Sequence, residues 1–220
     1  MTHRAPAGAP RVFRDREEAG RALAAALHGR VDRTHALVLA IPRGGVIVAT
    51  PVARALDAPL DVVIPHKLGA PRNPELAIGA VAPGVRVLDE DLTHALRVPG
   101  AYIEDEVATQ EAEIERRTTL YRGHRPAPVF AGVTVVVVDD GVATGATSLA
   151  ALRWARAQGS ARVVFAAPVG PVPALRLLAD ECDDVVILET PRAFRAVGEW
   201  YDRFDQVTDE QVLAALRDPS

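Results

Sequence analysis

Two adjacent carboxylates are the first candidates for chemistry in this sequence. Asp139 and Asp140 directly follow four consecutive valines in the segment VVVVDDGVATGAT, which spans residues 135–147. Such a run is typical of a strand that is covered on both faces, as in a parallel sheet. Because ligands of open α/β sheets bind at the carboxyl ends of the strands, we expect both side chains to reach a ligand there.

A loop of small residues follows the carboxylates and opens a helix, which is predicted from the helical spacing of Leu149, Leu152 and Ala155. Small side chains let backbone N–H groups close around a phosphate at the positive end of the helix, and threonine hydroxyls can add donors. Carboxylates repel a phosphate, so their presence indicates a ligand that also carries neutral hydroxyl groups, such as a ribose 5-phosphate. The predicted phosphate-binding residues are Ala143, Thr144, Gly145, Ala146 and Thr147.

The pattern Asp-Asp-x-x-x-Thr-Gly-x-Thr after a hydrophobic strand resembles the phosphoribosyl pyrophosphate signature of the type I phosphoribosyltransferases. It differs from a Walker loop, because no Gly-Lys-Ser/Thr follows, and from the dinucleotide pattern G-x-G-x-x-G. Together with PRGGV, KLGAPRNPELAIGAV and AVGEWY, it is most similar to a bacterial group of this family whose acceptor is undefined, and the resemblance covers most of residues 12–216. An ordinary strand, turn and helix with acidic turn residues is the alternative.

A second anion-binding loop is predicted at PRGG, residues 42–45, between the first core strand and a helix. Two glycines adopt backbone angles closed to other residues, so consecutive N–H groups can turn toward one anion, and an arginine adds a bidentate donor. In the resembled family a short loop at this position grips the pyrophosphate of the substrate, which implies this role for Arg43, Gly44 and Gly45. A tight turn without a ligand is the alternative.

Two cations, Lys67 and Arg72, lie in the segment PHKLGAPRNPE, residues 65–75, and could neutralise charge on a leaving pyrophosphate. Three prolines and a glycine predict a loop of unusual length for a compact domain. The resemblance implies that this loop is a lid, placed at residues 65–77, that closes over the active site. Two solvated cations in a surface loop are the alternative.

Aromatic residues gather near the C-terminus, in the segment 191–217. Phe194, Trp200 and Tyr201 are candidates for stacking on a flat acceptor as part of a hood. Equally, these residues and Phe204 could form a hydrophobic seam that fastens a C-terminal helix to the sheet.

The resemblance implies an Mg²⁺-dependent transfer of a 5-phosphoribosyl group from phosphoribosyl pyrophosphate to a small nitrogenous acceptor, such as a nucleobase, with release of pyrophosphate. Asp139 and Asp140 would orient the ribose hydroxyls and contact the Mg²⁺ through water. Ala143 stands where the 6-oxopurine enzymes usually carry an aspartate, which disfavours hypoxanthine and guanine as acceptors. Two alternatives remain: a regulator that senses phosphoribosyl pyrophosphate without turnover, and a hydrolase that acts on nucleotides or sugar phosphates.

The alternation of helices and strands predicts an α/β fold: a doubly wound, mainly parallel central sheet flanked by helices, with a small hood from the chain termini. Residues 1–11 are expected to be a disordered tail, residues 12–190 the core, and residues 191–220 the hood segment and a final helix. The predicted strands are 36–41, 61–64, 135–138, 161–167 and 184–188, with a hairpin at 78–82 and 85–88. Further helices are predicted at 13–28, 46–56, 102–121 and 171–180, with a last helix capped near 208–210.

Composition limits the function classes. The chain has 220 residues, of which 49% are hydrophobic, and a net charge of −4 with scattered basic residues, so we expect no nucleic-acid partner. The single cysteine, Cys182, excludes an internal disulfide and favours a cytoplasmic location. No apolar run is long enough to cross a membrane, and no pair of histidines has the spacing of zinc ligands. The charged helix at 102–121 and the resemblance are compatible with a homodimer.

Overall fold

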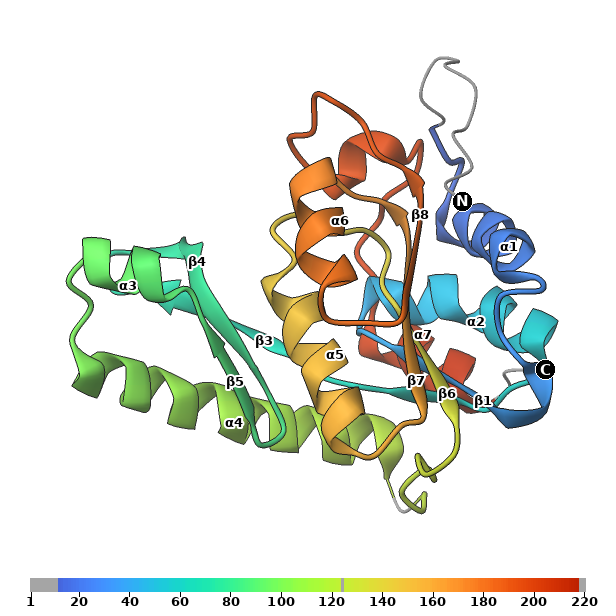
Figure 1. Ribbon diagram of the computed structural model, residues 1–220, viewed down its shortest axis with the longest axis horizontal. Coiled ribbons are helices and arrows are strands. Elements are labelled where there is room, and N and C mark those ends of the chain that lie inside the picture. The colour runs from blue at the N-terminus through green and yellow to red at the C-terminus, as the bar shows by residue number, and fades with distance from the viewer. Residues whose placement is uncertain (1–11, 124, 218–220) are drawn as a thin grey trace.

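The computed structural model describes residues 12–123 and 125–217, so the predicted tail at 1–11 lies outside the described residues. The chain forms a helix-covered parallel sheet and, beside it, an antiparallel arm (Figure 1). The predicted α/β class with a mainly parallel central sheet is confirmed. In the described part of the chain, no helix is both long and apolar enough to cross a bilayer.

The core sheet has five parallel strands in the order β2-β1-β6-β7-β8. The chain leaves β1 toward one edge of the sheet to form β2, and it later returns to the other side of β1 to form β6. The carboxyl ends of β1 and β6 therefore flank the point where the strand order reverses, which is where open α/β sheets bind ligands. The strands are β1 (Ala36–Ala40), β2 (Leu60–Val62), β6 (Thr134–Val138), β7 (Arg162–Val169) and β8 (Asp184–Glu189).

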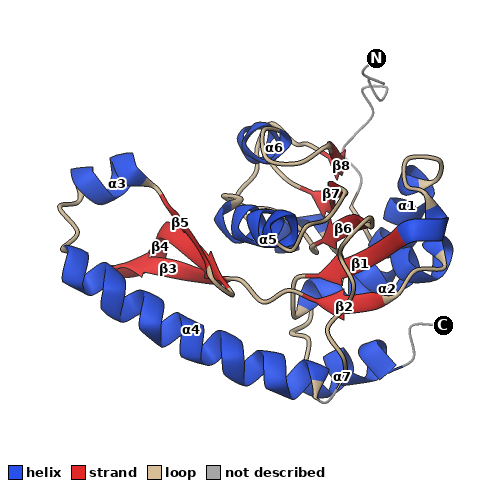
Figure 2. Ribbon diagram, turned by 60° about the horizontal axis from the view of Figure 1, so that its bottom comes forward, coloured by secondary structure: helices blue, strands red, loops and turns tan. Residues whose placement is uncertain are grey.

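Alternation along the central strands divides the apolar core between the two faces of the sheet. In β6, Val136 and Val138 pack on one face, whereas Val135 and Val137 pack on the other. Figure 2 shows helices α1 and α2 on one side of the sheet and α5 and α6 on the opposite side. The consecutive valines are thus buried on both faces, as the sequence predicts. These helices are α1 (Arg16–Leu27), α2 (Gly44–Leu56), α5 (Ala146–Ala157) and α6 (Val172–Ala179).

The final helix, α7 (Asp209–Arg217), packs against α2 and belongs to the core. Thr208 begins it with a reciprocal cap: the Gln211 N–H donates to the Thr208 hydroxyl at 3.3 Å, and the Thr208 N–H donates to Gln211 Oε1 at 2.8 Å. At the other end of the chain, Asp15 caps α1, as predicted, by accepting the Glu18 N–H at 2.9 Å.

The segment predicted as a long loop at 65–75 is a β-hairpin, so that prediction was wrong. Strand β3 (His66–Ala70) pairs antiparallel with β4 (Asn73–Ala82), with Pro71 and Arg72 in the turn between them. Its prolines suggested a loop, but Pro65 precedes β3 and Pro74 lies in the half of β4 that β5 (Val85–Leu88) does not pair with. Proline is compatible with a strand at such an edge. The predicted hairpin at 78–82 and 85–88 is confirmed as β4 and β5.

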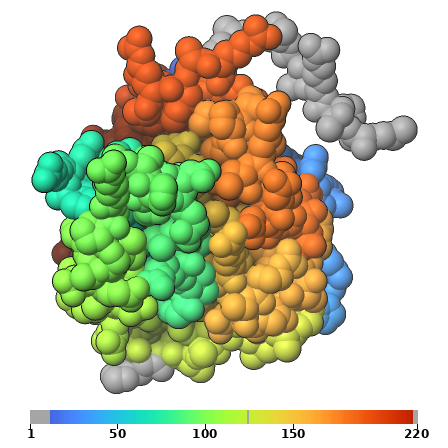
Figure 3. Space-filling view, turned by 60° about the vertical axis from the view of Figure 1, so that its left-hand side comes forward, coloured from blue at the N-terminus to red at the C-terminus, as the bar shows by residue number. Residues whose placement is uncertain are grey.

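A long helix, α4 (Gly100–Arg122), joins the arm to the core (Figure 2). In the arm, the Tyr102 hydroxyl donates to the Gly69 carbonyl at 2.9 Å, and near the core Ile114 and Tyr121 are buried. A short helix, α3 (Glu90–Ala95), precedes α4. Figure 3 shows the arm, in green, beside α5, in yellow-orange, which contacts all three strands of the arm. The arm is thereby held against the helix that opens at the predicted phosphate loop.

Candidate active site

The two predicted anion loops start side by side at the carboxyl ends of β1 and β6. The Ile41 N–H donates to the Val138 carbonyl at 2.9 Å, which aligns the two strand ends. A Cβ atom at Gly45 would lie 2.9 Å from that carbonyl oxygen and 3.1 Å from the Asp139 Cα, while one at Gly44 would overlap the Asp140 carboxylate. At Gly45 the closest neighbours are backbone atoms, whereas at Gly44 they are side-chain atoms of Asp140 and Arg16. The peptide bond between Pro42 and Arg43 is cis.

Asp139 faces a cavity of about 220 Å³ that the phosphate loop also lines. Its Oδ1 accepts the Asp140 N–H at 2.8 Å. Loss of water around the carboxyl group and the adjacent charge of Asp140 raise the pKa of Asp139 well above its usual range. A ligand or cation that compensates the negative charge would therefore favour the ionised form of Asp139.

The phosphate loop ends at the amino terminus of α5, where Gly145 adopts a φ of 87° at the N-cap position. The first N–H groups of a helix lack intrahelical partners and attract anions. Ser148, in the first turn, is fully buried, and its hydroxyl has no partner among the described residues. All five predicted phosphate-binding residues line the cavity, together with Lys67, Ala77, Asp139, Gly141, Val142, Ser148 and Val197.

The predicted cations do not all reach this cavity. Lys67, in β3, lines it and also pairs with the exposed Glu75, with Nζ 3.2 Å from Oε2. Arg72 lies exposed in the hairpin turn and is not among the described residues that line the cavity. The Arg43 side chain turns toward α7, where its Nη1 lies 3.9 Å from Asp209 Oδ1. Lys67 is thus the predicted cation that the fold brings to Asp139, whereas the roles of Arg43 and Arg72 stay predictions.

Trp200 and Tyr201, the candidates for stacking on an acceptor, are both buried in a small apolar cluster with Phe13, which favours the alternative of a hydrophobic seam. The rings of Phe13 and Tyr201 have centroids 5.8 Å apart, and the Phe13 N–H donates to the Trp200 carbonyl at 2.8 Å. These aromatics form a seam between the two ends of the chain and do not fasten α7. Phe194 packs only partly buried against the cluster, so its contact with an acceptor stays a prediction.

Among the residues at the site that sequence reasoning missed, Val197 and Arg16 lie outside the signature and the predicted loops. Val197 lines the cavity, and a Cβ at Gly141 would overlap its side chain. Arg16 reaches Asp140, with its Nε 2.7 Å from Oδ2. Neither residue belongs to a recognisable motif, although Val197 lies within the quoted stretch AVGEWY. Only the folded chain brings Arg16 to a partner so distant in sequence.

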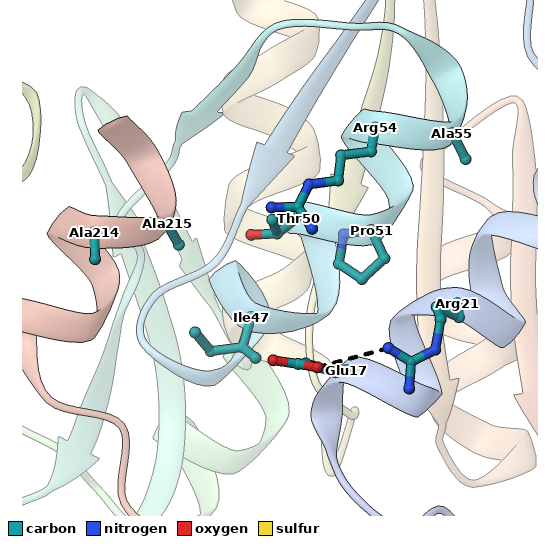
Figure 4. A pocket seen from close by; sticks show the side chains of 9 residues that line it. All are labelled: Glu17, Arg21, Ile47, Thr50, Pro51, Arg54, Ala55, Ala214 and Ala215. Carbon is teal, nitrogen blue, oxygen red and sulfur yellow. Dashed lines mark ion pairs between the residues drawn. The ribbon is translucent and has the colours of Figure 1, made fainter. Parts of the chain in front are cut away.

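A larger groove, of about 700 Å³, lies between α1, α2 and α7, away from the motif residues (Figure 4). Its lining includes Arg21 and Glu17, which pair at 3.6 Å, and the apolar side chains of Ile47 and Pro51. None of the predicted site residues is among the described residues that line it. The residues of the phosphoribosyl pyrophosphate signature therefore gather at the smaller cavity.

The donor set fits a magnesium ion that is held mainly by substrate oxygens. Among the residues the structure describes, no group of three or more His, Cys, Asp or Glu side chains could hold a metal by itself. Asp140 Oδ2 accepts a hydrogen bond from Arg16 Nε, and Asp139 Oδ1 accepts one from the Asp140 N–H. The other oxygen of each carboxylate takes no part in these two hydrogen bonds. Mg²⁺ commonly binds through one or two carboxylates together with substrate phosphates and water.

Comparisons with known proteins show the family of this chain. A family model described as the phosphoribosyl transferase domain matches residues 13–201, and the chain belongs to this family. Two curated proteins of Mycobacterium tuberculosis, from strains CDC 1551 and H37Rv and both named "Putative phosphoribosyl transferase", are 44% identical to it over 207 residues. The alignment covers 94% of this chain and 46% of each relative, so the chain spans about half their length. The crystal structure of TT1426 from Thermus thermophilus is 46% identical, with a TM-score of 0.78 over 93% of this chain and 97% of that one.

Proposed function

We propose that the protein transfers a 5-phosphoribosyl group from phosphoribosyl pyrophosphate to a small nitrogenous acceptor and releases pyrophosphate. The observation that carries this proposal is the shared cavity, which Asp139, Lys67 and the residues at the start of α5 line together. The helix terminus can hold the 5-phosphate, a carboxylate can accept hydrogen bonds from ribose hydroxyls, and a lysine can face the leaving group. Membership of a transferase family does not favour the alternative of a sensor without turnover.

In the proposed reaction, the bond between ribose C1 and the pyrophosphate oxygen breaks, and pyrophosphate leaves with the bonding electrons. The lone pair of the acceptor nitrogen forms the new bond to C1. Asp139 fixes the ribose ring and Lys67 compensates charge that grows on the leaving group, so catalysis consists of positioning and charge stabilisation. Asp139 and Asp140 would hold Mg²⁺ through water, and the ion would supply further positive charge for the departing pyrophosphate.

Part of the cavity lining is aliphatic, and we assign this part to the acceptor. Val142 and Val197 line it, and Ala143 offers no carboxylate to a base. We therefore expect a flat acceptor that is held by van der Waals contact, and one that lacks the oxo and N–H groups of hypoxanthine and guanine.

The test is to incubate the protein with phosphoribosyl pyrophosphate, Mg²⁺ and single acceptors: adenine, hypoxanthine, guanine, pyrimidine bases or ammonia. Acceptor-dependent release of pyrophosphate is the expected result, and an Asp139→Asn variant serves as the matched control without the carboxylate. Release that does not depend on any acceptor would favour hydrolysis instead. Tight binding without release for every acceptor would favour a sensor.

A further inference from the structure

Arg16 makes a shielded ion pair with the second acid of the signature. Its Nε lies 2.7 Å from Asp140 Oδ2, and the two side chains are only 11% and 17% exposed. Exposed ion pairs contribute little because water screens them, but a charge-assisted hydrogen bond at this distance and exposure holds its partner firmly. Arg16 lies outside the two predicted loops, at the first residue of α1.

The guanidinium of Arg16 is itself fixed on two further sides. Its Nη1 donates to the Asp205 carbonyl at 2.8 Å, and its Cζ lies 3.8 Å from the centroid of the Phe204 ring. Both partners belong to the segment that follows the buried aromatic cluster. A planar cation held by a carbonyl and an aromatic ring has little freedom to leave its carboxylate.

Asp140 is also held from its other sides. Its carbonyl accepts the Tyr201 hydroxyl at 2.5 Å, and its carboxylate occupies the space that a Cβ at Gly44 would fill. The Asp140 side chain therefore lies against the predicted pyrophosphate loop. Asp139, one residue earlier, lines the cavity instead. The Asp139 side chain thus faces the cavity, whereas the Asp140 side chain contacts Arg16 and Gly44.

We propose that Arg16 is a positioning residue, which holds the Asp140 carboxylate against the pyrophosphate loop and leaves Asp139 as the acid that meets the ribose. This inference rests on the proposed function. Two adjacent carboxylates repel each other and an incoming polyphosphate, so an arginine that compensates one of them lowers the cost of binding. Through Arg16, the start of α1 and the segment with Phe204 and Asp205 contact the site, although neither belongs to the signature.

The test compares Arg16→Gln and Arg16→Lys with Arg21→Gln, a control on the same helix whose cation pairs with Glu17 on the exposed surface. Each full-length variant is titrated with phosphoribosyl pyrophosphate and Mg²⁺ by calorimetry at a temperature where circular dichroism shows it folded. We expect Arg16→Gln to weaken binding about tenfold or more, the loss typical of removing a charged hydrogen bond. Arg16→Lys should recover part of it, because an ammonium can still reach the carboxylate, and Arg21→Gln should bind as the wild type does.

The rescue by lysine separates positioning from folding. A purely structural arginine would lower the melting temperature of Arg16→Gln while each folded molecule kept its affinity, and that result would overturn the inference. Binding by Arg16→Gln within twofold of a wild type that does bind would overturn it as well, and would leave the proposed function intact. Absence of binding by the wild type itself would instead overturn the proposed function, together with the inference built on it.

Discussion

The ionised form of the Asp139 carboxyl group lowers the stability of the fold. Its pKa is raised because protein atoms displace water from the carboxyl group and because Asp140 lies next to it. The pKa of an unfolded aspartate is about 3.9. Since the folded pKa lies above that value, the folded state is favoured when the group is protonated, and stability is lost as the pH rises from about 4 through the folded pKa.

The Asp139→Asn variant should therefore be more stable than the wild type at neutral pH, because it carries no carboxyl group that must ionise in the fold. Its urea unfolding curve should also depend less on pH above about 4, the unfolded pKa of aspartate. The same variant should lose affinity for phosphoribosyl pyrophosphate, because the ribose hydroxyls lose their acceptor. A variant less stable than the wild type at pH 7 would contradict this description of the carboxyl group.

Gly44 offers a second prediction at this scale, because a Cβ there would overlap the Asp140 carboxylate. Gly44→Ala should cost about 1–3 kcal/mol of stability, as overpacking does, and should displace Asp140. Gly100→Ala is the matched control at another helix start, since nothing lies within 4 Å of its added Cβ. The control should remain within about 1 kcal/mol of the wild type. Equal stability of the two variants in urea unfolding would show that the close approach is absent.

Among the structural elements, the antiparallel arm determines which of the predicted cations reaches the cavity. Strand β3 places Lys67 at the cavity, whereas the tight turn carries Arg72 at an exposed position. The register of β3 and β4 shifts at Gly69. A Cβ atom there would lie 2.7 Å from the Pro74 carbonyl oxygen, so the two strands approach closely at this bulge. Whether the arm moves as a lid stays a prediction.

Lys67→Gln should lower the rate of pyrophosphate release about 100-fold or more, the loss expected when a group that stabilises developing charge is removed. Arg72→Gln is the matched control and should change the rate little if its exposed position persists during turnover. Steady-state rates with saturating acceptor measure both. Unchanged release by Lys67→Gln would remove Lys67 from the reaction.

A second contact between elements joins α4 to α7 beside the pyrophosphate loop. The Tyr121 hydroxyl donates to Asp209 Oδ1 at 2.5 Å, and Arg43 lies 3.9 Å from the same oxygen. Burial and the hydrogen bond to Asp209 raise the pKa of Tyr121 to about 12. Through Asp209, the last helix can thus influence the orientation of Arg43.

The unfolding free energy of the wild type should fall as the pH rises from about 10, the unfolded pKa of tyrosine, to about 12. The sign follows from the raised folded pKa, since the protonated tyrosine is favoured in the fold. Tyr121→Phe should cost about 1 kcal/mol at neutral pH and should lose less stability over that alkaline range. Urea unfolding of both proteins, measured in parallel, isolates Tyr121 from the other tyrosines. Identical alkaline slopes would contradict the assignment.

Over the whole molecule, the sequence predicted those segments whose structure depends on residues that are neighbours in the chain. The valine run of β6, the small-residue loop before α5 and the Asp15 cap follow from burial, helix-terminus chemistry and capping. The hairpin at 66–82 did not, because proline content cannot reveal which half of a strand lacks a neighbour. Arg16 and the buried positions of Trp200 and Tyr201 depend on contacts between the two ends of the chain. No spacing rule contains such contacts.

The fold also explains why the site lies where it does. Reversal of the strand order between β1 and β6 opens the crevice, and the segments that contain Phe13 and Tyr201 pair through an isolated bridge. We infer that this crevice, and not the larger groove of Figure 4, binds a ribose 5-phosphate through the amides at the start of α5.

The most direct test is to titrate isotope-labelled protein with phosphoribosyl pyrophosphate and Mg²⁺ and to follow the amide resonances by NMR. We predict that the largest changes fall on the amides of residues 143–148 and on those of residues 43–45 at the neighbouring loop. Changes confined to the groove between α1, α2 and α7, or no change at saturating ligand, would contradict the account.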